Sequence, residues 1–302
     1  MTTFVFPGQG SQSIGMSKDF YDNFKSAKLI FEEISDYVDI DLRQLIFDDK
    51  ENLINLTNYT QIAIFTSSIA IFKTIEDENF IDLSNIEVMM GHSLGEYTAL
   101  ACSKKLDLEQ SSKVLKYRGE LMHNAVEPNL SGMAALIGMN SDEVEKIIRD
   151  NNINLEIAND NSPIQVVVSG DSYEIKKSEK VFLENKIKKF IKLNVSSAFH
   201  SKFMLSAQEE LNNEIDKLDF KENRIKIISN YSSEISNDNL IIKNALKNQM
   251  SNKVRWTESI KKLENIGQNK IIEIGPSKVL SGLIKRISST FDIKSISNIT
   301  DL

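Results

Sequence analysis

The chain is poor in the residues that build disulfides and metal centres. Its 302 residues include a single cysteine, Cys102, so no internal disulfide can form and a reducing compartment, the cytoplasm, is expected. Cys102 falls in a segment of small residues and is predicted to be a buried thiol, because free cysteine packs as a small hydrophobe. The three histidines and one cysteine are too few and too scattered to predict a metal site.

An excess of positive charge and long apolar runs are also lacking. The 43 acidic and 36 basic residues give a net charge of -7, which offers no positive field to nucleic acid or to an anionic membrane. The longest apolar region, residues 62–72, is short and interrupted by threonine and serine, and residues 1–10 carry no basic segment of a signal peptide. We therefore expect binding to neither nucleic acid nor membrane.

Apolar residues, in contrast, are frequent enough for a large core. They make up 41% of the chain, and the length predicts one large domain or two unequal ones. Strand and helix patterns alternate over much of the sequence, which predicts a mostly parallel sheet covered on both faces. Thr60 is expected to open a long covering helix that carries apolar residues as far as Ile75. A monomer is the default expectation.

The pattern changes in the middle of the chain. Strands are predicted at 133–137, 155–158, 165–169 and 190–193, and helices at 141–150 and 171–185. This βαββαβ order is that of a ferredoxin-like unit. The fold class predicted is therefore α/β, with a large α/β-hydrolase-like domain of mostly parallel sheet (1–127 and 197–302) and an inserted small ferredoxin-like domain (128–196). The small domain carries a run of lysines that forms a solvated face or, alternatively, docks an acidic partner: Lys176, Lys177, Lys180, Lys186, Lys188, Lys189 and Lys192.

The most informative motif is G-H-S-L-G at residues 91–95. An apolar strand pattern at 86–90 precedes it and a helix-forming segment at 96–104 follows, which is the context of a nucleophile elbow. Such a turn exposes the hydroxyl of Ser93 at its apex, and the amide of Leu94 points to where an oxyanion would form, near a helix N-terminus. The motif predicts acyl transfer, with an ordinary glycine turn as the alternative.

A second glycine loop, residues 7–12, follows a short strand at 3–6. Its sequence P-G-Q-G-S-Q has neither the lysine of a phosphate-binding P-loop nor the glycine spacing of a dinucleotide site. Close approach of this backbone to a reacting group is the functional interpretation, in which Gln9 supplies an amide donor. A solvated turn is the alternative.

A serine nucleophile needs a base, and histidine is the usual one near neutral pH. His92 adjoins Ser93, so the two side chains diverge, and His123 lies on a helix, turned away from Arg118. His200 lies in a loop where the chain re-enters the large domain, and we select it as the base. No Asp or Glu follows at a strand end in the usual esterase order, which favours a dyad completed by a neutral acceptor.

Arg118 interrupts the apolar stripe of its helix, between Leu115 and Met122. A buried guanidinium needs an anionic partner, because leaving that charge unpaired in the interior is costly. The spacing alone leaves two interpretations open, a structural salt bridge and a substrate anion.

Seven motifs follow one another over essentially the whole chain: F-P-G-Q-G-S-Q (6–12), G-H-S-L-G-E-Y (91–97), Y-R-G-E-L-M (117–122), N-S-P-I-Q-V-V-V-S-G (161–170), A-F-H-S (198–201), Q-M-S-N-K-V-R-W (249–256) and E-I-G-P-S-K-V-L-S-G-L (273–283). In sequence and in order, these motifs resemble those of the malonyl-CoA:acyl-carrier-protein transacylases.

The resemblance implies a ping-pong acyltransferase of fatty-acid synthesis. Ser93 would take the malonyl group from malonyl-CoA, and His200 would act as base and then acid. The phosphopantetheine thiol of acyl carrier protein would collect the group, with no cofactor. By the same resemblance, the oxyanion is held by the amides of Gln9 and Leu94.

The resemblance also implies roles for the surrounding residues. Arg118 would pair in bidentate fashion with the malonyl carboxylate. The backbone carbonyl of Gln249 would orient His200, and Asn161 matches an asparagine that family members carry near the site. Phe199 matches the family pattern associated with malonyl rather than the bulkier methylmalonyl.

Lys253 and Ser277 depart from the family pattern, where proline and glycine are common, and both positions look peripheral. Alternatives to the fatty-acid enzyme are a trans-acting acyltransferase of a polyketide line, a serine esterase and a catalytically idle scaffold. The kinetic preference between carrier proteins would separate the polyketide enzyme from the fatty-acid enzyme. Fast turnover of neutral esters that Arg118→Ala changes little would indicate an esterase. The intact Ser93, His200 and Arg118 argue against an idle scaffold.

Overall fold

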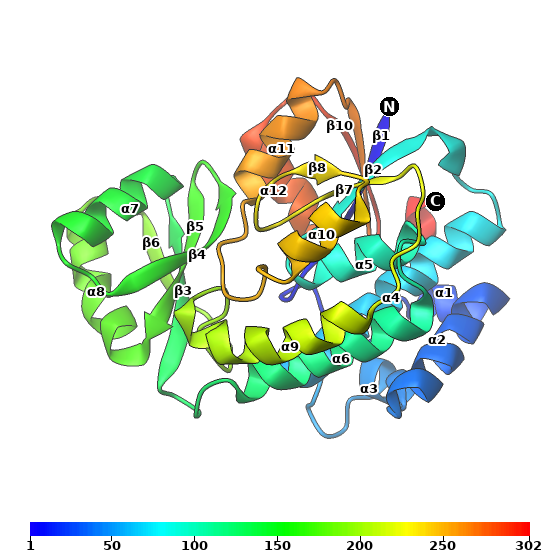
Figure 1. Cartoon of the computed structure of the whole chain (residues 1–302), viewed down its shortest axis with the longest axis horizontal. Helices are drawn as coiled ribbons and strands as arrows, with labels where there is room; N and C mark the ends of the chain where they lie inside the picture. Colours follow the sequence, from blue (N-terminus) through cyan, green and yellow to red (C-terminus); the bar gives the residue numbers. More distant parts are fainter.

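The computed structural model describes all 302 residues and contains two sheets (Figure 1). The larger sheet has the strand order β10-β9-β1-β2-β7-β8, and all neighbouring strands are parallel except β7 and β8. Its strands are β1 (Thr2–Phe6), β2 (Ile86–Gly91), β7 (Lys226–Ile228), β8 (Ile235–Ser236), β9 (Lys270–Ile274) and β10 (Asp292–Ile296). The smaller sheet is antiparallel, with the order β4-β5-β3-β6. Its strands are β3 (Ser131–Ile137), β4 (Leu155–Ser162), β5 (Gln165–Asp171) and β6 (Lys189–Lys192).

Helices cover both sheets. They are α1 (Lys18–Asn23), α2 (Lys25–Val38), α3 (Leu42–Phe47), α4 (Thr57–Asp77), α5 (Leu94–Cys102), α6 (Leu108–Asn124), α7 (Ser141–Asp150), α8 (Ser172–Glu184), α9 (Leu205–Lys217), α10 (Asn239–Leu246), α11 (Trp256–Asn265) and α12 (Val279–Ile287). Short 3-10 turns lie at Leu83–Asn85, Lys202–Met204 and Ile299–Asp301. The prediction of a mixed α/β protein with a mostly parallel sheet is confirmed.

The large sheet is apolar on both faces because successive side chains of a strand point to opposite sides. Phe4 of β1 packs edge-on against Phe72 of α4 in the main core. The neighbouring Val5 belongs to a second cluster on the opposite face, together with Trp256 of α11 and Leu283 of α12. A helical layer on each face therefore fixes the sheet in the middle of the large domain.

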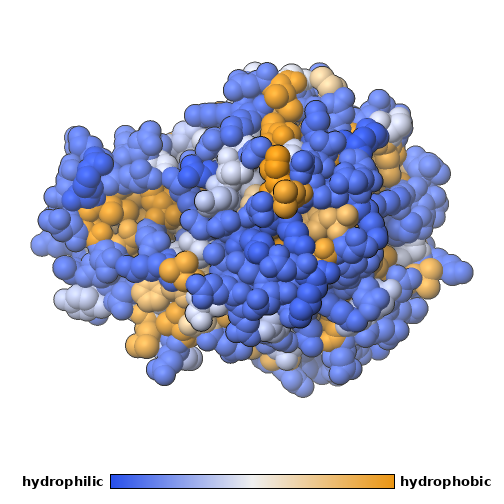
Figure 2. Space-filling model, viewed as in Figure 1, coloured by the Kyte–Doolittle hydropathy of each residue, from blue (hydrophilic) through white to orange (hydrophobic).

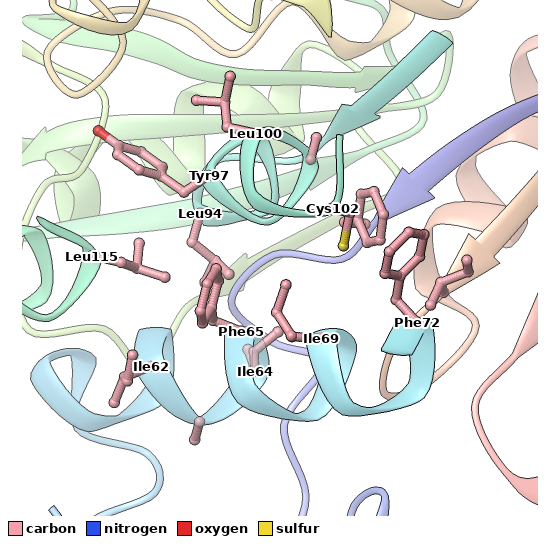
Figure 3. Close-up of a cluster of buried hydrophobic side chains, with 14 of the residues drawn as sticks. Ile62, Ile64, Phe65, Ile69, Phe72, Leu94, Tyr97, Leu100, Cys102 and Leu115 are labelled. Atoms are coloured by element: carbon pink, nitrogen blue, oxygen red, sulfur yellow. The ribbon is translucent and has the colours of Figure 1, made fainter. Parts of the chain in front are cut away.

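Helix α5 is held in place by its packing on α4. Figure 3 shows α5 crossing above α4 with apolar side chains between them, among them Leu94, which points toward Phe65. Cys102, at the other end of α5, lies in the same cluster as a free, buried thiol whose pKa is raised by burial. The buried thiol predicted from the sequence is confirmed, and the start of α5 is anchored immediately after residue 93.

The small sheet is also covered on both faces. In the chain its elements follow the order β3, α7, β4, β5, α8, β6, and α7 and α8 pack on one face, around Leu136 and Phe182. Residues of the other face, such as Ala135 and Val167, belong to the same main core as Phe4 and Phe72. A backbone hydrogen bond of 3.0 Å from the amide of Asp160 to the carbonyl of Val254 adds a link to the large domain.

One expectation about the elements was wrong, and two strands, β8 and β10, were missed. Helix α4 begins at Thr57 rather than Thr60, because the Thr60 hydroxyl donates to the carbonyls of Ile54 and Leu56 instead of capping the helix. Strand β10 was not expected at all. It is an edge strand in which only Ile296 is buried, so it has no apolar run that could have indicated it.

The surface is mostly hydrophilic in the view of Figure 2, where hydrophobic residues form separate small groups. The lysines of the small domain are all exposed, and two of them, Lys177 and Lys180, pair with glutamates of their own helix. No helix combines the length and the apolar character needed to cross a bilayer.

Candidate active site

The turn between β2 and α5 has the geometry of a nucleophile elbow. Ser93 adopts φ 52° and ψ −109°, a conformation that is unfavourable for a residue with a Cβ. The flanking glycines allow the close approach that the turn requires. A Cβ on Gly91 would lie 2.0 Å from the carbonyl of Gly95, and a Cβ on Gly95 would lie 2.2 Å from the carbonyl oxygen of Phe6. Side chains at these two positions would therefore break the turn.

His200 lies beside the hydroxyl of Ser93. Its Nε2 is 2.8 Å from Ser93 Oγ, while its Nδ1 faces two backbone carbonyls, that of Gln249 at 3.0 Å and that of Asn252 at 3.1 Å. Because carbonyl oxygens only accept, Nδ1 must carry the hydrogen, and Nε2 is left to accept the serine proton. The structure thus brings together the serine and the histidine selected from the sequence.

The surroundings keep the imidazole neutral. Burial, together with the positive charge of Arg118, lowers the pKa of His200 to about 3. No carboxylate lies on Nδ1, in agreement with the neutral acceptor expected from the sequence. The arrangement can remove a proton from Ser93 without first having to lose one.

Arg118 reaches the same oxygen from α6. Its Nη2 donates to Ser93 Oγ at 3.0 Å and to Gln249 Oε1 at 2.9 Å, and its Nη1 donates to Gln61 Oε1 at 2.5 Å. These partners are neutral, and the buried Nε has no partner. The guanidinium is 1% exposed, so it is a buried positive charge that is held by amides rather than by a salt bridge. Such a charge favours an anionic ligand.

The backbone amides of Gln9 and Leu94 make no hydrogen bond within the protein. Gln9 follows β1, whereas Leu94 begins α5, and both line the cavity that contains Ser93. The side chain of Gln9 is held by a 3.3 Å bond from its Nε2 to Thr57 Oγ1. Two unpaired donors beside a nucleophile can bind the oxygen of a tetrahedral intermediate.

The cavity around Ser93 is small, about 90 Å³, and mixed in character. Phe199, predicted from the sequence to border the substrate, is 5% exposed and is one of the lining residues. The lining consists of Gln9, Gln61, His92, Ser93, Leu94, Arg118, Met122, Met133, Asn159, Leu193, Val195, Phe199 and His200. Ser93, His200 and the positive charge of Arg118 therefore meet in one small cavity.

Asn161 is not among the residues that line the cavity. Its Oδ1 lies 2.8 Å from Nε2 of His92, which does line it, and the asparagine of this segment that reaches the cavity is Asn159. His92 also packs against the ring of Trp256, with 5.6 Å between the ring centroids. In the structure, therefore, Asn161 contacts His92, a residue of the cavity lining, and does not itself line the cavity.

Several residues of the site were not found from the sequence. Asn230 Oδ1 accepts from the amide of Ser93 at 2.6 Å, and Glu96 lies buried next to it. Asn230 lies two residues after β7, at the carboxyl end of a parallel strand beside the elbow, where ligand-binding residues of parallel sheets gather, so a signal for it existed. Gln61, in the middle of α4, carried no such signal. No group of three or more His, Cys, Asp or Glu is arranged to hold a metal ion.

The chain is similar in sequence and in structure to known acyltransferases. The model of the acyl transferase domain family matches residues 3–300. A malonyl CoA-acyl carrier protein transacylase of Bacillus subtilis is 36% identical over 299 residues, which are 98% of this chain and 93% of that protein. The crystal structure of a malonyl CoA-acyl carrier protein transacylase from Clostridium perfringens is similar with a TM-score of 0.92 and 34% identity, covering 99% of this chain and 94% of the other. The structure of a malonyl-transacylase in complex with a type II polyketide synthase acyl-carrier protein is similar with a TM-score of 0.94 and 30% identity. The match covers 99% of this chain and 97% of that one.

Proposed function

The chain belongs to the malonyl-CoA:acyl carrier protein transacylases of the acyl transferase domain family, and we propose that it transfers malonyl from malonyl-CoA to the phosphopantetheine thiol of acyl carrier protein. The observation that carries the proposal is the position of Ser93 Oγ, 2.8 Å from His200 Nε2 and 3.0 Å from Arg118 Nη2. A nucleophile between a base and a buried positive charge fits an acyl donor that ends in a carboxylate. The malonyl group supplied in this way serves fatty-acid elongation.

In the first half of the reaction, His200 Nε2 takes the proton of Ser93 as Oγ attacks the thioester carbonyl. The carbonyl oxygen becomes negative and is held by the amides of Gln9 and Leu94. When the tetrahedral intermediate collapses, the carbon–sulfur bond breaks and His200 returns the proton to the departing CoA sulfur. Malonyl is left as an ester on Ser93.

In the second half, the thiol of the carrier replaces CoA in the cavity. His200 takes its proton, the sulfur attacks the ester carbonyl, and Ser93 Oγ leaves with the proton from His200. The acyl group thus leaves one thiol, that of CoA, and ends on another, that of the carrier, and the scheme uses no cofactor. Because free thiols persist in reducing compartments, we place the reaction in the cytoplasm.

Arg118 supplies selectivity for the acyl group. In the free enzyme one hydrogen of its Nη2 is donated to Ser93 Oγ. Once that oxygen is part of an ester it is a poorer acceptor, and the guanidinium can turn to the malonyl carboxylate in a bidentate pair. A neutral ester gains nothing from this charge, which disfavours the esterase alternative.

The remaining site residues act around this centre. The backbone carbonyl of Gln249 orients His200 by accepting its Nδ1–H, at 3.0 Å, a role that it shares with the carbonyl of Asn252. Phe199 narrows the space beside the α-carbon of the acyl group. We propose that Asn161 acts indirectly, by fixing the ring of His92 in the cavity wall.

The finer fold description is part of the proposal. The strand order β4-β5-β3-β6 and the βαββαβ chain order support a ferredoxin-like small domain over residues 128–196. The elbow between β2 and α5 supports a hydrolase-like large domain made of residues 1–127 and 197–302. We take the monomer as the working form.

The test is to incubate the protein with radiolabelled malonyl-CoA, remove free CoA, and add holo-acyl carrier protein. Label is expected first on the protein and then on the carrier, and the same procedure with His200→Ala is expected to give almost none. Apo carrier, which lacks the thiol, is the control acceptor. Label that stays on the protein, or that is released to water as fast with apo as with holo carrier, would contradict the proposal.

A further inference from the structure

A glutamate without a catalytic assignment lies directly under the elbow. Glu96, in the first turn of α5, is 0% exposed. Its Oε2 accepts two hydrogen bonds, one from the side-chain Nε2 of Gln249 at 2.7 Å and one from the backbone amide of Asn230 at 3.1 Å. Its other oxygen, Oε1, has no partner. One buried oxygen atom of α5 thus binds two residues, Asn230 and Gln249, that lie far from Glu96 in the sequence.

Both residues that Glu96 holds are bonded to the backbone of Ser93. Asn230 Oδ1 accepts from the amide N–H of Ser93 at 2.6 Å, and Gln249 Nε2 donates to the carbonyl of Ser93 at 3.0 Å. Asn230 Nδ2 in addition donates to the carbonyl of Gly91 at 2.7 Å. The backbone N–H and the backbone carbonyl of the nucleophile are therefore each held by an amide side chain, and both amide residues are bonded to Glu96.

Glu96, Asn230 and Gln249 together form a clamp on the backbone of Ser93, which would otherwise relax to a more favourable conformation. The φ of 52° and ψ of −109° at Ser93 belong to a sparsely populated region, which is strained and persists only where surrounding contacts fix it. If Ser93 relaxed, Oγ would turn away from His200, and a displacement of about 1 Å can slow a reaction about 100-fold.

We propose that Glu96 is a positioning residue, which holds the strained elbow through Asn230 and Gln249 so that Ser93 Oγ faces His200. The inference rests on the proposed function in naming Ser93 the nucleophile. The positioning depends on where the acceptor oxygen Oε2 of Glu96 lies, which the length of the side chain determines. Gln249 gains a second task, because its side chain serves the elbow while its backbone carbonyl orients His200.

The alternative is that Glu96 acts on the site through its negative charge and not through the position of its acceptor oxygen. Arg118 is the titratable group whose charge acts on Glu96, and its guanidinium donates no hydrogen bond to the Glu96 carboxylate. Burial raises the pKa of Glu96 to about 7, so near neutral pH a large fraction of molecules carry a neutral carboxyl that still offers an acceptor oxygen. Reach and charge can be separated by two substitutions, since Gln keeps the length without the charge and Asp keeps the charge on a shorter side chain.

The experiment measures two rates for the wild type, Glu96→Gln and Glu96→Asp: modification of Ser93 by an uncharged fluorophosphonate, and formation of the malonyl-enzyme. Melting temperatures report folding, and Glu109→Asp, an exposed glutamate in the first turn of α6, is the matched control. Glu96→Asp is expected to slow both rates about 10- to 100-fold. Glu96→Gln is expected to slow both rates about threefold or less, because an amide oxygen can accept the same bonds.

Wild-type rates in Glu96→Asp, or a larger loss in Glu96→Gln than in Glu96→Asp, would overturn the proposal. Asn230→Ala tests it independently if Glu96→Asp does not fold, since it removes the acceptor for the Ser93 amide and keeps the backbone amide that Glu96 holds. That variant is expected to slow the fluorophosphonate reaction at least about tenfold, and an unchanged rate would overturn the clamp. The fluorophosphonate carries no malonyl group, so a wild type that reacts with it but does not take up malonyl would refute the proposed function and leave the inference standing.

Discussion

Ser93 Oγ lies 2.8 Å from Nε2 of His200, although 107 positions of the sequence separate the two residues. After the elbow the chain forms α5 and α6, builds the whole antiparallel sheet, and comes back just before His200 to the elements around the parallel sheet. The contact therefore depends on how the two sheets pack together as well as on the elbow itself. Phe199 and His200 come directly after the antiparallel sheet, so a shift of one sheet relative to the other would change the distance between Ser93 and His200.

The first prediction concerns the nucleophile. Ser93→Ala removes the only oxygen that His200 and Arg118 both contact, so it is expected to abolish the malonyl-enzyme adduct and to lower transfer at least about 10³-fold. Intact-mass spectrometry after incubation with malonyl-CoA is the measurement, and unchanged melting would show that the fold is kept. A malonyl adduct of normal yield on the variant would assign the nucleophile elsewhere.

The second prediction concerns Arg118. Replacing it by Ala removes a buried charged contact, for which losses of about 2 to 5 kcal/mol are typical, corresponding to roughly 30- to 5,000-fold in rate. Since Nη2 also contacts Ser93 Oγ, transfer of the uncharged acetyl group is expected to fall as well, but much less. The quantity to measure is the malonyl-to-acetyl ratio of kcat/KM. A ratio that does not change would mean that Arg118 supports Ser93 only and does not bind the carboxylate.

The third prediction is a pH dependence. Burial, with the charge of Arg118, lowers the pKa of His200 to about 3, whereas the unfolded chain titrates near the ordinary value of 6.5. The base is therefore already unprotonated at mildly acidic pH, and kcat/KM for malonyl-CoA is expected to stay level, within about twofold, from pH 8 to pH 5. An acid limb with a midpoint near 6.5 would contradict this. The titration of Glu96 near 7 leaves the rate level if its acceptor oxygen matters and its charge does not.

The same shift acts on stability. The folded state excludes a proton that the unfolded state binds below pH 6.5, so the contribution of His200 is fully present above 6.5 and is lost as pH falls toward 3. The melting temperature of His200→Gln is therefore expected to fall less than that of the wild type between pH 6.5 and pH 4. Parallel melting curves over this range would contradict the shift.

The parts of the fold and site that depend on neighbouring residues could be predicted from the sequence. Strands β2 and β9 are apolar runs, and the turn at Ser93 is indicated by the glycines that it requires. His200 followed by elimination among few histidines, and the neutral acceptor on its Nδ1 followed from the absence of a suitable acid.

Other parts depend on contacts between distant segments and left no local pattern. Gln61 lies inside a long buried helix, and nothing in its neighbours distinguishes it from a core polar residue until Arg118 is seen against it. The side-chain amide of Gln249 and the backbone amide of Asn230 meet at Glu96 only after α5, β7 and the loop before α11 have packed. Strand β10, polar and at the sheet edge, was missed because its residues show no run of buried side chains.

The last prediction concerns the size of the acyl group. Phe199 is 5% exposed and lines a cavity of about 90 Å³, in which an additional methyl group on the α-carbon has little room. Phe199→Ala removes the ring beside that position and is expected to raise the methylmalonyl-to-malonyl ratio of kcat/KM about tenfold, since one methyl group in an apolar pocket is worth roughly 1–3 kcal/mol. Steady-state transfer to holo carrier from each CoA ester gives the ratio, and Phe203→Ala, a partly buried phenylalanine that does not line the cavity, is the control. Because Phe199 adjoins His200, the malonyl rate alone is expected to fall somewhat. An equal loss for both substrates would show that the ring positions the histidine and does not select the acyl group.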